Sequence, residues 1–145
     1  MYEVGLAQTR ELFGDYLDGS PSALICAVSA QVLGEAARAA LESSAAALGY
    51  GHGAVTFATL ADAEGALDGP ALFALVEGLD PLCVVAADAE AATALSQAYR
   101  QELPPMKAAR LFGRPAVAFD SFEQMLADDQ AKQRAWALLK TLPRL

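Results

Sequence analysis

Residues 114–142 read RPAVAFDSFEQMLADDQAKQRAWALLKTL, and this stretch decides how the rest of the chain is interpreted. Its first part, RPAVAF (114–119), is an apolar run typical of a strand buried on both faces. A short turn of helix is expected at 122–127, followed by a longer helix. The inward positions of that helix are Ala131, Ala135, Leu138, Leu139 and Leu142, and Pro143 ends it. A buried strand followed by an amphipathic helix is the repeating unit of α/β proteins.

The same unit recurs upstream. Three further apolar runs are typical of buried strands: ALICAVS (23–29), GAVTFAT (53–59) and LCVVAA (82–87). Helices are expected at 6–17, 31–48, 70–79 and 88–101, with Gly49, Pro70 and Asp88 as end signals. Strands that alternate with helices predict a parallel sheet covered on both faces. We therefore expect a single α/β domain over 1–145, a three-layer sandwich with a central four-stranded parallel sheet.

Composition limits the class of protein. The chain has 145 residues, of which 54% are hydrophobic, and this suits one domain with a sizeable core. No apolar run approaches the roughly 18–20 residues that span a bilayer, and the start lacks the pattern of a secretory signal. Cys26 and Cys83 lie in strand-like runs, which indicates buried, reduced thiols. With these two cysteines and His52 as the single histidine, we expect no metal site and no cofactor. Because the chain shows neither a membrane-spanning run nor a secretory signal, we expect a cytoplasmic location without membrane partners.

Charge is unevenly distributed along the chain. The net charge is −8, made up of −11 over residues 1–98 and +3 over residues 99–145. The acidic part argues against a nucleic-acid partner, because such proteins usually present a basic surface to phosphates. The basic residues that cluster in sequence are Arg100, Lys107, Arg110 and Arg114. They form either a solvated loop and helix end, or a binding site for a small anion or an acidic protein.

The order of these segments resembles that of the family-4 uracil-DNA glycosylases. The stretches that carry the resemblance are 9–30, 48–59, 79–95, 113–121 and the last helix with Lys132, Trp136, Leu139 and Lys140. They correspond to the family's entry into the first strand, its second strand, its third strand with the following helix, its fourth strand and its closing helix. The resemblance implies a uracil-DNA-glycosylase-like fold over most of the chain.

The resemblance fails at the residues that do the family's chemistry. Asp120 and Ser121 stand where the family has a catalytic His-Pro pair, and a carboxylate has the wrong sign beside a developing oxyanion. Ser29 replaces the acidic residue that assists water, and Thr59 replaces the asparagine that reads uracil. No aromatic residue between Gly34 and Gly49 could stack on a base, and two cysteines cannot hold the family's four-cysteine iron–sulfur cluster. We therefore predict no catalytic residues.

Five polar residues remain as candidate ligand contacts because parallel sheets bind ligands beyond the carboxyl ends of their strands. They are Ser29, Thr59, Asp88, Asp120 and Ser121. Each also has a structural interpretation, as a strand-end hydrogen bonder, a turn residue or a helix cap. Ser29 lacks an activating base, since His52 lies in a separate glycine-rich loop. Trp136 is expected to pack in the core or on a helix face rather than to stack on a ligand.

The preferred hypothesis is a non-catalytic uracil-DNA-glycosylase-like domain that acts as a binding or interaction module for an unknown protein or small molecule. An alternative is an enzyme of different chemistry that uses the polar residues at the strand ends. Retained DNA glycosylase activity ranks third. The Ala-rich stretch ESSAAALGY (42–50) is compatible with a helix-mediated homodimer, and equally with tight packing on the sheet.

Overall fold

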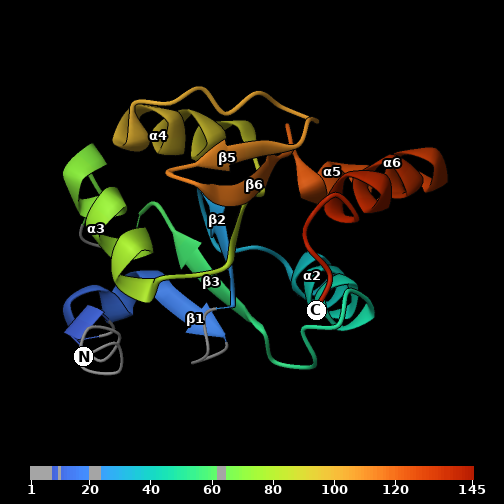
Figure 1. Ribbon diagram of the computed structural model, residues 1–145, viewed down its shortest axis with the longest axis horizontal. Coiled ribbons are helices and arrows are strands. Elements are labelled where there is room, and N and C mark those ends of the chain that lie inside the picture. Colours follow the sequence, from blue (N-terminus) through green and yellow to red (C-terminus); the bar gives the residue numbers. More distant parts are fainter. Residues whose placement is uncertain (1–7, 10, 20–23, 62–64) are drawn as a thin grey trace.

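A six-stranded sheet runs through the computed structural model, which describes residues 8, 9, 11–19, 24–61 and 65–145 (Figure 1). Its strands are β1 (Leu17–Gly19), β2 (Ile25–Ser29), β3 (Val55–Thr59), β4 (Cys83–Ala86), β5 (Ala109–Leu111) and β6 (Arg114–Ala118). They lie in the order β1-β3-β2-β4-β6-β5. The four inner strands are parallel, and each outer strand is antiparallel to its neighbour. The α/β class is confirmed, and the sheet is six-stranded and mixed rather than four-stranded and parallel throughout, because a short antiparallel strand extends it at each edge.

Both edge strands form where the sequence lacks an apolar run. The helix expected at 6–17 covers only part of that range: the described residues 8, 9 and 11–13 are helical, a 3-10 turn η1 (Gly14–Tyr16) follows, and the chain then extends into β1. Leu6, which was placed on that helix, lies outside the described residues. At the opposite edge, Phe112 and Gly113 have φ values of 52° and 85°, which make the two-residue turn between β5 and β6.

The helices begin and end close to the expected signals. They are α2 (Glu35–Ala47), α3 (Gly69–Leu79), α4 (Ala89–Tyr99), α5 (Phe122–Met125) and α6 (Asp129–Leu139). Asp88 caps the start of α4 and Ser121 caps the start of α5, as predicted. Gly49 follows α2 with φ 96°, the left-handed conformation expected of a glycine at a helix end.

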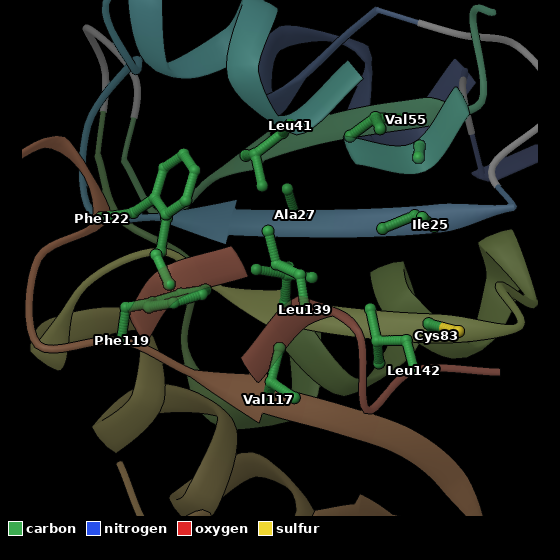
Figure 2. Close-up of a cluster of buried hydrophobic side chains, with 14 of the residues drawn as sticks. Ile25, Ala27, Leu41, Val55, Cys83, Val117, Phe119, Phe122, Leu139 and Leu142 are labelled. Atoms are coloured by element: carbon green, nitrogen blue, oxygen red, sulfur yellow. The ribbon is translucent and has the colours of Figure 1, made fainter. Parts of the chain in front are cut away.

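Two apolar clusters lie on opposite faces of the sheet. Figure 1 shows α3 and α4 on one side and α2, α5 and α6 on the other. Successive strand residues alternate between the clusters, so that Ala27 packs towards α2 and α6 while Cys26 and Val28 pack towards α3 and α4. Figure 2 shows Ala27 facing Leu139 on the first of these sides. Burial on both faces explains why the inner strands read as continuous apolar runs.

Both cysteines are buried, as predicted, and they form no disulfide with each other. Burial raises the pKa of Cys26 to about 12, so this thiol stays protonated and unreactive at neutral pH. The sulfur of Cys83 lies 3.2 Å from the hydroxyl of Tyr50, which also donates to the carbonyl of Pro143. Both residues therefore serve the core.

Among the described residues, no helix has the length and apolar character needed to cross a bilayer.

Candidate functional site

The carboxyl ends of the four parallel strands meet at one edge of the sheet. From β2 the chain crosses through α2 to β3 on one side, and it then returns through α3 to β4 on the other side of β2. The order therefore reverses between β2 and β4, and this is the position at which open α/β sheets bind ligands. All five candidate ligand contacts follow or end these strands.

Asp88 lies between the ends of β2 and β4, where the strand order reverses. One oxygen of its carboxylate accepts a hydrogen bond from Ala91 N at 2.8 Å and so caps α4. The other oxygen accepts from Ala30 N at 2.9 Å, just beyond the end of β2. A further hydrogen bond joins the start of α4 to the residue after β6, where Ala89 N donates to the carbonyl of Asp120 at 3.0 Å. Both oxygens of Asp88 are thus engaged in holding the strand ends together.

This double role predicts a large stability effect. Asp88→Ala should lower the free energy of unfolding by about 2 kcal/mol, because it removes a helix cap and leaves the N–H of Ala30 without its acceptor. Asp68 is the matched control, since it caps α3 through Ala71 N alone and is exposed. Asp68→Ala should cost only about 1 kcal/mol. Urea denaturation of both variants checks this, and equal losses would contradict the second role of Asp88.

Ser29 and Thr59 are brought together. They are register partners in the parallel pair β2 and β3, and both line a cavity of about 210 Å³. Ser29 is only 2% exposed, and its hydroxyl donates to the carbonyl of Gln31 at 2.6 Å. Thr59 is half-buried at the cavity wall. Asp88, Asp120 and Ser121 do not line this cavity, so only two of the five candidate ligand contacts lie together here.

Asp120 and Ser121 lie apart from that cavity. The hydroxyl of Ser121 accepts from Gln124 N at 3.2 Å and caps α5, as its sequence context predicted. Asp120 is exposed and lines two clefts of about 280 and 360 Å³ on the α4 and α5 sides. In the next turn of chain, Glu123 accepts from Gly34 N at 3.0 Å and ties the loop after β2 to α5.

Arg38 is a site residue that sequence analysis did not identify. Its guanidinium lies 4.7 Å above the centre of the Phe57 ring and pairs with Asp18 at 2.8 Å. The hydrogen bond from Gly19 N and the pairing with Arg38 hold the pKa of Asp18 below its ordinary value. Nothing in the sequence links a helix residue to a residue of the unpredicted strand β1, so no local signal could have revealed this contact.

Arg38 stands between two hollows that share its side chain. One is the cavity with Ser29 and Thr59, and the other is a groove of about 710 Å³ between α2 and the β1–β3 edge. The carboxylates that line these hollows belong to Asp15, Asp18, Glu35 and Glu42. Among the residues that the structure describes, Arg38 is the only cation that lines either hollow, so this region, which we call the Arg38 groove, is acidic.

The predicted basic cluster is divided by the fold. Arg114 is half-buried and pairs with Glu77 and Asp80, both at 2.9 Å. Arg100, Lys107 and Arg110 are exposed. Arg110 donates to the carbonyl of Gly113 at 2.9 Å and so braces the β5–β6 turn. Arg114 is therefore a structural residue, and three of the four candidates remain on the surface.

His52 is exposed in the loop before β3, as expected. Within the part of the chain that the structure describes, no three His, Cys, Asp or Glu side chains group as a metal site requires. No protein-family model matches the sequence, and no curated protein matches it either. The function is therefore inferred from the fold and from the contacts of the candidate residues.

Proposed function

We propose that this chain is a non-catalytic binding domain that resembles the uracil-DNA glycosylases in fold but does not share their chemistry. The observation that supports this most directly is the engagement of the strand-end groups in the fold itself. Asp88 holds Ala30 and Ala91, Ser29 donates to Gln31, and Ser121 caps α5. A catalytic group has to contact the reacting atoms, and these three are held by other bonds.

The electrostatics of the strand ends support the same proposal. Glycosylase chemistry needs a carboxylate for water activation and a donor for the uracil anion. Ser29 supplies a neutral, buried hydroxyl at the first position. Asp120 supplies an exposed carboxylate at the second, where its charge would repel the leaving base. Neither Ser29 nor Asp120 therefore supplies the chemistry of the family residue whose position it occupies.

The Arg38 groove is the surface that we propose for partner binding. It combines the aromatic ring of Phe57 with four carboxylates and one cation. Glu42 is held rigid because it accepts from Gly53 N and Val55 N, both at 2.9 Å. Excess negative charge beside an aromatic face favours a positively charged partner and disfavours nucleic acid.

Uracil excision tests the proposal. Single-stranded and double-stranded DNA carrying uracil should show no cleavage above the enzyme-free control, and DNA binding should be absent at physiological salt. Glycosylase activity that Asp120→Ala abolishes would overturn the non-catalytic proposal. Tight, strongly salt-dependent DNA binding would overturn the argument from charge.

A second function is favoured by one observation, the shared cavity of Ser29 and Thr59. An enzyme of different chemistry could use this cavity if Ser29 were activated. The described hydrogen bond of Ser29 runs to a carbonyl rather than to a base, which argues for the first function. Covalent labelling of Ser29 by a fluorophosphonate probe would favour the second.

A further inference from the structure

A second hollow lies on the opposite side of α2 from the Arg38 groove. It is a cleft of about 440 Å³ between α2 and the α5–α6 region, within the size range of small-molecule sites. We call it the α2–α6 cleft. It shares no lining residue with the Arg38 groove, so its role is independent of the proposed function.

One wall of the α2–α6 cleft is small and uncharged. It consists of Ala36, Ala40, Ser43 and Ser44, which recur along one face of α2. The hydroxyl of Ser44 donates to the carbonyl of Ala40 at 2.8 Å, so its proton is already used within the helix. The acidic residues Glu35 and Glu42 line the Arg38 groove and not this cleft. This wall is therefore uncharged and lets a ligand lie close to the helix backbone.

The opposite wall combines apolar side chains with positive charge. Leu126, Trp136 and Leu139 supply the apolar surface, and Lys132 is the only charged residue that lines the cleft within the described part of the chain. Lys132, Trp136 and Lys140 follow one face of α6 at four-residue intervals. The ammonium of Lys140 lies 5.7 Å from the centre of the Trp136 ring.

The positive charges of the two lysines are not balanced by a carboxylate in the described ion pairs. The described ion pairs use Arg38 and Arg114, and neither Lys132 nor Lys140 takes part in one. Asp128, at the start of the same helix, accepts from Ala131 N at 2.9 Å as the helix cap. Although the chain carries a net charge of −8, the two lysines beside Trp136 give this part of the surface positive charge.

We propose that the α2–α6 cleft binds an amphiphilic anion: a small molecule with an apolar body and a single carboxylate. The body lies between the small wall of α2 and the ring of Trp136. The carboxylate lies at Lys132, with Lys140 adding positive potential. A neutral or cationic amphiphile of the same length lacks this charge complementarity and should bind more weakly.

Trp136 makes the test direct because it is the only tryptophan of the chain. Its fluorescence is followed while the protein is titrated with decanoate, and separately with decyltrimethylammonium, below micelle-forming concentrations. We expect a saturable change with decanoate and a clearly weaker response to the cationic probe. Absence of saturation with decanoate, or an equal response to both probes, would overturn the proposal.

Variants locate the site. Lys132→Gln should weaken decanoate binding about twofold to fivefold, as expected for the loss of one exposed charge contact. Arg144→Gln, which removes an exposed cation outside the cleft, should leave the affinity unchanged. Equal affinities of the Lys132→Gln variant and the wild type would contradict the assignment of the carboxylate.

Filling the cleft tests the apolar contact. Ala40→Leu places a larger side chain in the wall and should abolish binding, with circular dichroism confirming the fold. If that variant does not fold, Ser43→Leu at the exposed rim takes its place. Undiminished decanoate affinity in a folded cleft-filling variant would place the ligand elsewhere.

Discussion

Replacing Arg114 by methionine is expected to lower the free energy of unfolding by about 3 kcal/mol. Arg114 lies at the start of β6 and holds α3 through two parallel hydrogen bonds to Glu77, at 2.9 and 3.0 Å. It also donates to the carbonyl of Pro81. The side chains of Arg114 and Glu77 are only 17% and 22% exposed. Methionine keeps the packing but leaves the Glu77 carboxylate partly buried without its cation.

Urea denaturation at neutral pH measures this loss, and Arg110→Met is the matched control. Arg110 is exposed, and its described hydrogen bond reaches only Gly113, so its replacement should cost less than about 0.5 kcal/mol. Similar losses for both variants would show that the buried pairing is not the source of the effect.

The effect of Arg114 should also depend on pH. Burial raises the pKa of Glu77, but hydrogen bonds from Arg114 and Tyr99 outweigh burial and hold this pKa below its ordinary value. A group whose pKa falls on folding stabilises the protein above its unfolded-state pKa, and this contribution is lost as the pH falls through the folded-state value. The difference between wild type and Arg114→Met should therefore shrink below the ordinary glutamate pKa of about 4.3.

Phe119→Ala is expected to cost about 4 kcal/mol, because it leaves a cavity in the core. Phe119 follows β6 and is 0% exposed. Its ring centre lies 5.0 Å from that of Phe122 in a tilted arrangement. Figure 2 shows both rings at the end of the cluster that also holds Leu41 and Leu139. The loss therefore removes contacts between the sheet and the helices on this face.

Phe112 provides the control for this second variant. It is 67% exposed at the β5–β6 turn, although its ring centre lies 5.8 Å from that of Phe73. Phe112→Ala should cost less than about 1 kcal/mol, since little apolar surface returns to water. If the two alanine variants unfold at the same urea concentration, the core assignment of Phe119 is wrong.

The inner sheet could be predicted because its signals are local. Apolar runs mark β2, β3, β4 and β6, and single residues such as Asp88 and Gly49 mark helix ends. The edge strands carry no such signal, because three residues are too few to show a period. The β5–β6 turn was hidden as well, since Phe112 occupies a left-handed position at which asparagine or aspartate is usual.

The candidate site was predicted less completely, because its contacts join distant parts of the chain. The capping role of Asp88 is visible in its local sequence, whereas its bond to Ala30 spans 58 residues. Arg114 was grouped with its basic neighbours in sequence, yet its partner Glu77 lies 37 residues earlier. Arg38 could be placed on a helix, but its contact with Asp18 depends on β1, which only tertiary pairing creates.

The two short outer strands limit how copies of this protein can associate. Within the described residues, an incoming strand could align with only the three residues of β1 or the three residues of β5. In β5, Arg110 lies opposite Pro115, which has no N–H to donate. The backbone N–H and C=O of Arg110 therefore point away from β6, towards the open edge, whereas those of Ala109 and Leu111 point towards β6. Sheet extension between copies of the chain is therefore disfavoured at both described edges.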